Sequence, residues 1–594
     1  MTVCISAPIM TAMPRAISVE TLRHSTAHLM AAAVKKRFPA ARLGIGPVID
    51  DGFYYDFDTK ADLSPSSFAA IENEMRAMIA QKLPFRKEWM TTARAIAFFR
   101  KRKEPHKMEL IGELRRKGIK KVSVYWTGEH FADLCTGPHL RSTGDIPRDA
   151  FALTKTAGAY WRGDEKNAQL KRLYGTAWPT KQELDTYLAM LKEAERRDHK
   201  RLGPALDLFT FSDLVGSGLP LWTPKGTLIR TLLDDFVWRL REARGYERVE
   251  IPHITKKELF EKSGHWEKFG EDLFRVTSRE GHLFAIKPMN CPHHTQIYKR
   301  KLFSYRELPQ RYANTTMAYR DEQSGELAGL SRTRGFTQDD AHVFCRNAQV
   351  KEEMLKVWDI VDAFYGAFGF SLRVRLSFHD PKRPKDYLGE KSTWRKAEKE
   401  IIALAEARGA KAERAPGEAA FYGPKVDFLA KDSLGREWQV ATIQLDVNLP
   451  ERFDLSCVDE KGKPERIVMI HAAIMGSIER FLAILIEHVA GDFPVWLAPV
   501  QVRVLPIAER HHAQAESAIA ALKKSGVRAE LSPAGETLGK RIREGELNKI
   551  PYLAVLGDRE ESEGTLTIRS RGSNRQETLT PETFAARIRE GAPR

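Results

Sequence analysis

Two pairs of side chains that can bind a metal or transfer a proton lie in the N-terminal third of the chain. His24 and His28 are four residues apart, and Cys135 and His139 repeat that spacing. Residues i and i+4 share one face of a helix, so the two imidazoles can converge on one atom. With the Cys and the third His they form a possible four-ligand zinc site. The same groups could instead line a hydrolytic pocket that positions a water.

Two further stretches contain residues suited to a nucleotide. Arg320 and Glu322 are two apart on a predicted strand and therefore point to one face. An Arg binds phosphate bidentately, and a Glu accepts from an amino group. A second strand is predicted after the following loop, and it contributes a further cation, Arg332, and an aromatic ring, Phe336. Downstream, a strand feeds a helix on which we place Arg480 two turns along, within reach of a terminal phosphate.

Composition limits the classes of protein to consider. The 594 residues predict three or four domains, and the net charge of +16 favours a polyanionic partner such as nucleic acid. No run of about 18 apolar residues occurs, and residues 1–18 lack a basic n-region, so we predict neither a membrane span nor a signal peptide. Five dispersed cysteines exclude a disulfide framework and predict a reducing, cytoplasmic location.

Local patterns predict the elements that would position these groups. Ser18 can cap a first helix. Thr180 and Glu183 form a capping box that opens another helix. That helix ends in a solvated run of charged residues, which stops at Gly203-Pro204. A helix over 225–244 runs into a strand that ends in Pro, which suits a sheet edge or a dimer interface. After about residue 500, alternating strands and helices predict a small α/β domain with a largely parallel sheet.

Three of these stretches resemble motifs 1, 2 and 3 of class II aminoacyl-tRNA synthetases, in the same order and spacing. They are the helix over 225–244 with its strand, the stretch from Arg320 to Phe336, and the strand and helix that contain Arg480. Four further runs resemble threonyl-tRNA synthetases: Lys287–Pro292, Arg334–His342, Ala420–Lys425 and Trp438–Asp446. The first segment, with its two His and Cys/His pairs, looks like the editing domain of that family. The resemblance covers roughly residues 17–594.

The resemblance implies a multidomain α+β and α/β fold. It comprises a catalytic core built on the antiparallel sheet of class II synthetases, an α+β editing domain and a C-terminal α/β anticodon-binding domain. The expected ranges are 1–16 for a disordered tail, 17–203 for the editing domain with its linker helix, 204–495 for the catalytic domain and 496–594 for the anticodon-binding domain. The small N-terminal domain of many family members would be missing.

The implied function is ATP-dependent attachment of L-threonine to its tRNA through threonyl-adenylate, with hydrolysis of mischarged seryl-tRNA. Rival functions are a class II synthetase for serine or proline, an RNA-binding paralogue without charging activity, and a metallohydrolase of aminoacyl esters. The Cys/His/His set and the editing segment argue against the first. Retention of Arg320 and Arg480 argues against the second, and the third would leave about two thirds of the chain unused.

In the family, one Zn2+ per subunit is held by positions that match Cys291, His342 and His471. Three protein ligands leave one position open, as a substrate-binding zinc requires. The amino and hydroxyl groups of threonine would coordinate it, whereas valine has no hydroxyl. Serine retains the hydroxyl, and a missing methyl group discriminates by only about 10–200-fold, so a second hydrolytic site is needed.

The resemblance also assigns the other site residues. For ATP, with Mg2+ bridging the phosphates, they are Arg320 at the α-phosphate, Glu322 at the adenine amino group, Phe336 against the ring, Arg332 and Arg480 at the γ-phosphate, and Gln439. For threonine they are Asp340, Tyr422, Thr442 and Gln444, with Arg320, Arg480, Lys425 and Gln338 as catalytic residues. For editing they are His24, His28, Lys107, Asp133, Cys135 and His139, and for the anticodon Arg543, Glu560 and Arg569.

Four positions depart from the family pattern: His293, Ala441, Ala472 and Gly535. None is a proposed ligand. The implied partners are tRNA for threonine, threonine and ATP, together with a second copy of the chain in a homodimer through the motif 1 face. The basic segment 100–121, with ten basic residues against three acidic ones, would help to hold the acceptor end of the tRNA.

Overall fold

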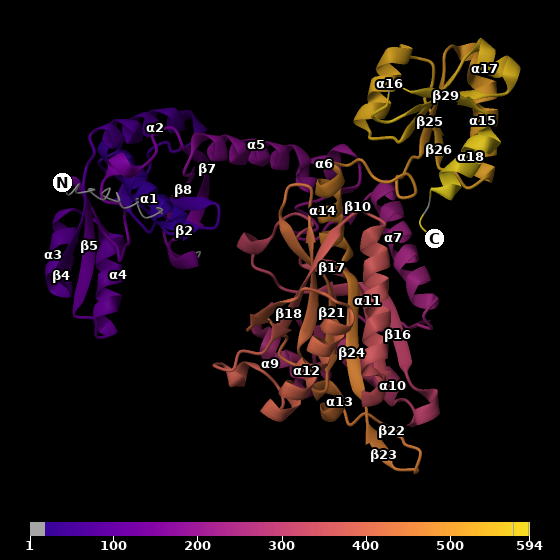
Figure 1. Ribbon diagram of the computed structural model, residues 1–594, viewed down its shortest axis with the longest axis horizontal. Coiled ribbons are helices and arrows are strands. Elements are labelled where there is room, and N and C mark those ends of the chain that lie inside the picture. The colour runs from indigo at the N-terminus through magenta and orange to yellow at the C-terminus, as the bar shows by residue number, and fades with distance from the viewer. Residues whose placement is uncertain (1–17, 165, 574, 592, 594) are drawn as a thin grey trace, which may run out of the picture. The chain divides into compact units, whose positions relative to one another are not determined.

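The computed structural model describes residues 18–164, 166–573, 575–591 and 593 (Figure 1). The predicted tail over 1–16 lies outside these ranges. The chain divides into two compact units, one ending at Lys192 and one beginning at Glu193. Among the helices of the described ranges, none combines the length and the apolar character needed to cross a bilayer.

The first unit is an α+β structure with two antiparallel sheets, as predicted. Its helix α1 (Val19–Arg37) is capped by Ser18, whose Oγ accepts from the Thr21 amide at 3.1 Å. One sheet consists of β1 (Arg42–Leu43), β2 (Val48–Ile49), β3 (Gly52–Asp58), β7 (Phe151–Tyr160) and β8 (Gln169–Ala177). The other consists of β4 (Phe85–Thr91), β5 (Lys121–Thr127) and β6 (Phe131–Leu134). The remaining helices are α2 (Pro65–Ala80), α3 (Thr92–Lys101) and α4 (Pro105–Arg116).

The predicted capping box is present at the start of α5 (Lys181–Arg197). The Glu183 amide donates to Thr180 Oγ1 at 3.2 Å, and the Thr180 amide donates to the Glu183 carboxylate at 3.0 Å. The prediction of one solvated charged helix up to Gly203-Pro204 is wrong. A new helix, α6 (His199–Ala205), begins after Asp198 and includes that Gly-Pro pair. His199, the first residue after the break between α5 and α6, is buried. Its Nδ1 lies 2.6 Å from the carboxylate of Glu487, which belongs to the same unit.

An eight-stranded sheet forms the centre of the second unit, in the order β11-β16-β17-β24-β21-β20-β18-β19. Its strands are β11 (Glu247–Arg248), β16 (Gln310–Tyr319), β17 (Gly335–Cys345), β18 (Ser371–Phe378), β19 (Glu413–Pro416), β20 (Lys425–Lys431), β21 (Glu437–Asp446) and β24 (Val468–Ser477). All pairings are antiparallel except the two edge pairs. The predicted antiparallel class II core is confirmed, with β11 at the predicted sheet edge.

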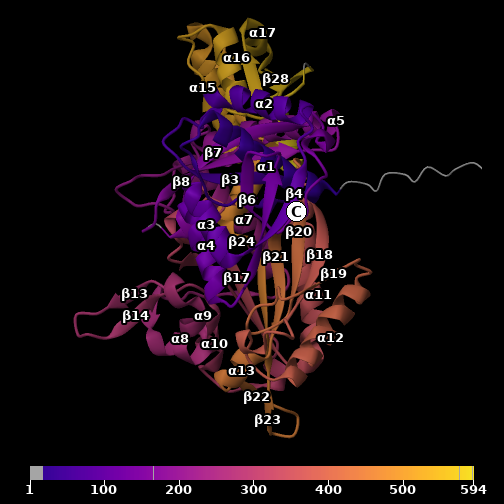
Figure 2. The same cartoon turned by 90° about the vertical axis from the view of Figure 1, so that its left-hand side faces the viewer.

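Helices cover one face of this sheet. They are α7 (Pro224–Glu242), α11 (Val350–Gly366), α12 (Lys391–Ala407) and α14 (Ile478–Val489), and they share one apolar core with the central strands (Figure 2). Strands β9 (Phe209–Thr210) and β10 (Leu221–Trp222) belong to the helix-covered side, because Phe209 and Trp222 pack in that same core. The other smaller elements are β12 (Ile254–Lys256), α8 (Lys257–Ser263), α9 (His265–Phe269), β13 (Arg275–Thr277), β14 (Leu283–Ile286), α10 (Cys291–Lys299), β15 (Phe303–Ser304), α13 (Asn448–Arg452), β22 (Ser456–Val458) and β23 (Pro464–Arg466).

Two predictions about the nucleotide-binding motifs are wrong in detail. Arg320 and Glu322 lie in the loop beyond the end of β16, not on a strand. The backbone amide of Arg320 still bonds to the Arg334 carbonyl at 2.9 Å, so the loop is held at its base. Arg480 lies in the first turn of α14 instead of two turns along, because β24 continues to Ser477, which caps the helix.

The C-terminal sheet is mixed, where we predicted it largely parallel. Its order is β26-β25-β27-β28-β29, and only the first three strands are mutually parallel. The elements are β25 (Val502–Pro506), α15 (His512–Lys524), β26 (Ala529–Leu531), α16 (Leu538–Leu547), β27 (Tyr552–Leu556), α17 (Asp558–Glu563), β28 (Leu566–Ser570), β29 (Gln576–Leu579) and α18 (Pro581–Glu590). The sequence analysis missed α17 and β29 because both are short and polar, so they have no clear apolar period.

A bulge at the centre of the catalytic sheet is occupied by a carboxylate. Gln338 pairs with Ser477 and Asp340 with Ala473, so three residues of β24 face the single residue Asp339. The amides of Ile474 and Met475, which the bulge removes from the ladder, donate to Asp339 at 3.0 and 2.9 Å. Arg241 of α7 pairs with the same carboxylate at 3.3 Å. Asp339 thus satisfies the donors that this bulge releases.

We predict that Asp339→Ala strongly destabilises the catalytic domain. Both Asp339 and Arg241 are almost fully buried, and removing one partner of a buried pair costs about 3–5 kcal/mol because an uncompensated charge remains. Thermal unfolding of the full chain measures this loss. The control is Glu577→Ala, which breaks the exposed pair with Arg587 and should leave the unfolding midpoint unchanged. Equal midpoints for the two variants would contradict the role of Asp339.

Candidate functional site

The pairing register of the catalytic sheet brings distant residues into rows. His342, His471, Gln444 and Lys425 lie opposite one another across β17, β24, β21 and β20. Two residues along, Asp340, Ala473, Thr442 and Asp427 form the neighbouring row. Side chains alternate along a strand, so both rows project from the same face. Residues separated by up to 130 positions or so in sequence therefore share one site.

Cys291, the first residue of α10, completes a group with His342 and His471. Their candidate ligand atoms all lie within 4.8 Å of one another, and all three residues are buried. His342 Nε2 is 3.0 Å from His471 Nδ1, and His471 Nε2 is 3.0 Å from Asp446. No spacing rule links these three positions, which the family resemblance named and which the fold brings together.

The donor set fits a zinc ion. A carboxylate only accepts, so Asp446 holds the proton on His471 Nε2 and leaves the Nδ1 lone pair facing the group. Burial, together with His471, lowers the pKa of His342 well below its usual value, which keeps that imidazole neutral as a metal ligand must be. Burial raises the pKa of the Cys291 thiol, whose thiolate a bound cation would stabilise.

An arginine-lined cavity of about 490 Å³ lies on the same face of the sheet. Every residue expected to bind ATP lines it: Arg320, Glu322, Arg332, Phe336, Gln439 and Arg480. The guanidinium of Arg320 lies between the rings of Phe269 and Phe336, 5.2 Å from each centroid. Burial and the charge of Arg332 lower the pKa of Arg480, as expected where cations converge without an anion. This cavity is suited to a polyanion that carries a flat ring.

Glu322 is engaged by Arg332, whose Nε lies 2.7 Å from its carboxylate. The same arginine reaches Glu326 at 3.1 Å. Arg332 is half exposed, so this pairing is solvent-screened and readily exchanged. A phosphate could therefore draw Arg332 away and release the Glu322 carboxylate for another donor.

The residues expected to bind threonine surround the Cys/His/His group. The Tyr422 ring lies 4.9 Å from the His471 ring, and Asp340 accepts from Asn290 at 3.1 Å. Gln444 is the strand partner of His471. Gln338 and Thr442 line the arginine-rich cavity, so they lie where the two sites meet.

Asp427 is a residue that sequence reasoning missed. Its carboxylate receives Lys425 Nζ at 3.0 Å, Thr442 Oγ1 at 2.8 Å and Gln439 Nε2 at 2.8 Å. Three residues predicted for substrate thus converge on one buried anion. Asp446 was also missed as a partner of His471, although it ends one of the quoted runs. The available signal was that Asp446 is the last residue of the run Trp438–Asp446, which resembles the family.

Two of the departures from the family pattern face away from the site. Ala441 and Ala472 are buried in the core beneath the helices. His293 is different: it lies next to Pro292 on α10, is 6% exposed, and has no hydrogen-bond partner at either ring nitrogen. Gly535 has open space around its Cα, so the structure gives no steric reason for that residue.

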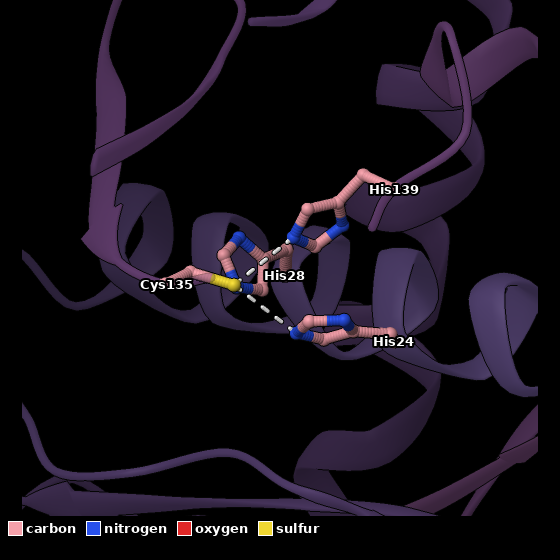
Figure 3. A group of neighbouring side chains, drawn as sticks. All are labelled: His24, His28, Cys135 and His139. Atoms are coloured by element: carbon pink, nitrogen blue, oxygen red, sulfur yellow. Dashed lines mark hydrogen bonds between the residues drawn. The ribbon is translucent and has the colours of Figure 1, made fainter. Parts of the chain in front are cut away.

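The first unit contains a second cluster, shown in Figure 3. His24 and His28 project from α1, and Cys135 and His139 come from the segment after β6. Cys135 Sγ lies 3.2 Å from His24 Nε2 and 3.3 Å from His139 Nε2. The i, i+4 argument therefore placed the imidazoles correctly on one face.

Hydrogen bonds link three members of this cluster, His24, Cys135 and His139, whereas the buried His28 Nδ1 has no partner within the described part of the chain. The Pro138 carbonyl accepts from His24 Nδ1 at 3.1 Å, so the Nε2 lone pair faces Cys135. Burial raises the pKa of Cys135 to about 11, and the resulting S–H can donate to that lone pair. Ser25 Oγ accepts from the Leu140 amide at 2.9 Å and lies 3.2 Å from His139 Nδ1. Its hydroxyl can donate there, which directs His139 Nε2–H toward the sulfur. These bonds are compatible with the hydrolytic-pocket interpretation, and the four candidate ligand atoms, all within 4.8 Å of one another, are compatible with the zinc interpretation as well.

A buried ion pair lies beside the cluster. Lys107 Nζ is 2.6 Å from Asp133, which also accepts from Tyr55 at 2.5 Å and from the Leu134 amide at 2.7 Å. Burial lowers the pKa of His24 and, more strongly, that of His28, so both imidazoles are neutral near pH 7. One cavity of about 540 Å³ is lined by five of the six predicted residues. The sixth, His139, does not line it, and its Nε2 lies 3.3 Å from Cys135 Sγ.

The three residues expected to read the anticodon lie on three elements: Arg543 on α16, Glu560 on α17 and Arg569 on β28. Arg543 is exposed on α16, and Arg569 on β28 lies 3.6 Å from Glu546 of that helix. Glu560 accepts from the Gly557 amide and from Thr567, so it caps its own helix. Thr567 and Arg569 share a face of β28, which places Glu560 and Arg569 on the same side of the sheet.

Comparison with protein-family models gives three matches along the chain. Residues 274–489 match the tRNA synthetase class II core domain (G, H, P, S and T). Residues 501–591 match an anticodon binding domain. Residues 122–174 match the threonyl and alanyl tRNA synthetase second additional domain. The three matches follow the predicted order of domains.

Relatives and solved structures agree with these matches. Threonine–tRNA ligase of Gloeobacter violaceus is 48% identical over 96% of this chain and 92% of its own, and that of Porphyromonas gingivalis is 46% identical over 95% and 86%. A structure of the RNA binding domain of threonyl-tRNA synthetase from Cryptosporidium parvum matches at 36% identity and a TM-score of 0.65, covering 67% of this chain and 99% of that one. Prolyl-tRNA synthetase of the same organism, 16% identical with a TM-score of 0.53 over 66% and 76%, shares the fold. The chain belongs to the threonyl-tRNA synthetase family.

Proposed function

We propose that this protein attaches L-threonine to its cognate tRNA at the expense of ATP and hydrolyses mischarged seryl-tRNA. The observation that carries the proposal is the buried Cys291, His342 and His471 group on the same sheet face as the arginine-lined cavity. In this proposal residues 17–203 edit, 204–495 activate and transfer threonine, and 496–594 bind the anticodon.

Activation joins the two halves of the catalytic site. Arg320 neutralises the α-phosphate while Arg332 and Arg480 hold the γ-phosphate, and Mg2+ would add to this neutralisation of charge. The threonine carboxylate attacks the α-phosphorus, threonyl-adenylate forms and pyrophosphate leaves. Cys291, His342 and His471 would hold a zinc ion, which would supply a Lewis-acidic position for the substrate's amino and hydroxyl groups. Catalysis by the chain's own residues is then mostly positioning and charge neutralisation.

Editing uses the cavity of the first unit. The ester of a seryl-tRNA enters it, a water attacks the ester carbonyl, and the bond to the terminal ribose oxygen breaks. His24, neutral and partly exposed, exchanges the Cys135 S–H at its Nε2 for that water, accepts the proton of the water and passes it to the departing ribose oxygen. Lys107, held by Asp133, stabilises the developing oxyanion. The basic segment 100–121 assists by attracting the acceptor end.

The motif 1 face supports a homodimer. Within the described ranges, strand β11 pairs with β16 alone and its outer edge is unpaired. A cavity of about 350 Å³ lies beside it, lined in part by Arg248–Ile251. A second copy of the chain would cover this edge. We also propose a cytoplasmic location, in keeping with the free cysteines at 135, 291, 345 and 457.

Pyrophosphate exchange tests the charging function. Purified, zinc-loaded protein should exchange pyrophosphate into ATP strongly with threonine, more weakly with serine and not with valine, because valine has no hydroxyl to coordinate. The test compares the three amino acids at equal concentration. Absence of exchange with threonine from a folded, zinc-loaded protein would overturn the proposal in favour of an RNA-binding paralogue.

Metal analysis tests the assignment of the zinc site. The wild-type chain should contain one zinc, which Cys291→Ser should lose because two imidazoles alone hold the ion weakly. Cys135→Ser should retain the full content, since Cys135 is already hydrogen-bonded to His24, His139 and the Gly137 amide. Elemental analysis after dialysis gives the count independently of activity, and Cys345→Ser is a buried control. Two zinc ions per chain would falsify the metal-free editing pocket.

Deacylation of seryl-tRNA tests the editing site. We expect His24→Ala to slow it by about 10²–10⁴-fold, the usual contribution of a general base, while threonine charging stays unchanged. Burial lowers the pKa of His24 below 6.5, so the wild-type rate should be constant at neutral pH and fall only on acidification below that value. If acidification already lowered the rate at pH values above 7, His24 could not be the base.

A further inference from the structure

Trp89, on β4, is exposed at the rim of the editing cavity. Its side chain is 60% exposed, yet it lines the same cavity as His24, Lys107 and Cys135. An exposed tryptophan is costly unless something covers it, because its large apolar face remains in water. The deacylation chemistry described above gives this residue no role.

The sheet register fixes where Trp89 lies relative to the reacting groups. Trp89 pairs with Ser123, and Ser123 is adjacent to Cys135, whose amide donates to its carbonyl at 3.2 Å. The Ser123 hydroxyl in turn donates to the Cys135 carbonyl at 2.6 Å. The three residues form one row across β4, β5 and the end of β6, on one face. With strands about 4.8 Å apart, Trp89 lies two strands, or roughly 10 Å, from Cys135.

The cavity changes character along this row. At the Cys135 end it is polar, with His24, Lys107 and Asp133. The same cavity is also lined by the apolar side chains of Leu110, Leu114 and Ile119. Two cations lie near Trp89: Lys87 Nζ is 4.9 Å from its ring, and Lys121, which lines the cavity, is the strand partner of Thr91, two residues along β4. An apolar aromatic platform flanked by cations is the arrangement that binds an unpaired nucleobase and its phosphate.

We propose that Trp89 is the stacking platform for the 3′-terminal base of the acylated RNA, with Lys87 and Lys121 close to the adjoining phosphate. The inference rests on the proposed editing function and deepens it. When the ester carbonyl lies near His24 and Cys135, the ribose spans the middle of the row and the base reaches the indole. Trp89 is therefore a positioning residue that acts on substrate binding and leaves the proton transfers to the polar end.

Steady-state deacylation of seryl-tRNA by three variants tests the platform. Stacking on one aromatic strengthens binding by roughly 5- to 150-fold, so Trp89→Ala should raise KM by about tenfold or more with kcat within twofold of wild type. Trp89→Phe keeps a stacking face and should restore most of the loss. Tyr160→Ala removes another exposed aromatic that does not line the cavity, and it should behave as wild type. An unchanged KM in Trp89→Ala, or equal defects in the Ala and Phe variants, would overturn the proposal.

A binding measurement separates the platform from the chemistry. Calorimetry with a non-hydrolysable adenosine bearing a 3′-serylamide should give weaker binding to Trp89→Ala than to wild type, and little change for serine amide without the nucleoside. If wild type bound the adenosine compound through Trp89 but released no serine from tRNA, the editing function would fail while the platform stood. Equal affinities in wild type and Trp89→Ala would remove the platform even from a protein that edits.

Discussion

The buried carboxylate of Asp339 is the constraint on which the catalytic site depends. It takes up the two amides released by the bulge of β24 and is backed by Arg241, so the pairing of β17 with β24 has one satisfied arrangement. Side chains alternate across a sheet, and a slip of one residue would turn the site residues toward the helices. The rows that contain His342, His471 and Gln444 exist only in this register. A single buried ion pair beneath the sheet therefore determines the geometry above it.

Both candidate sites place charged or proton-transferring groups in surroundings that disfavour their charged forms. Burial lowers the pKa of His24, His28 and His342 and raises that of Cys135 and Cys291. The consequence differs between the sites, because their partners differ. In the catalytic domain Asp446 orients His471 so that the lone pair of Nδ1 faces the Cys/His/His group. In the first unit the Pro138 carbonyl and Ser25 orient His24 and His139, and both imidazoles approach Cys135.

Local patterns predicted much of the fold. The Ser18 cap, the Thr180 capping box and β27 were correct because each depends on residues within a few positions of one another. Failures occurred where distant contacts decided the outcome. The charge run after α5 breaks at Asp198 because His199 is buried against Glu487, almost 290 residues away. Arg320 and Glu322 are in a loop because β16 ends at Tyr319, and short polar elements such as β29 have no apolar period to detect.

The sequence by itself determined the family, the order of the domains and the identity of most candidate site residues. Those inferences needed only residue types and their order along the chain. The convergence of Cys291, His342 and His471, the roles of Asp339 and Asp427, and the row from Trp89 to Cys135 were decided by the tertiary structure. Their physical reason is shared: each depends on strand register and burial, which bring together residues far apart in sequence and set their hydrogen-bond partners and charge states.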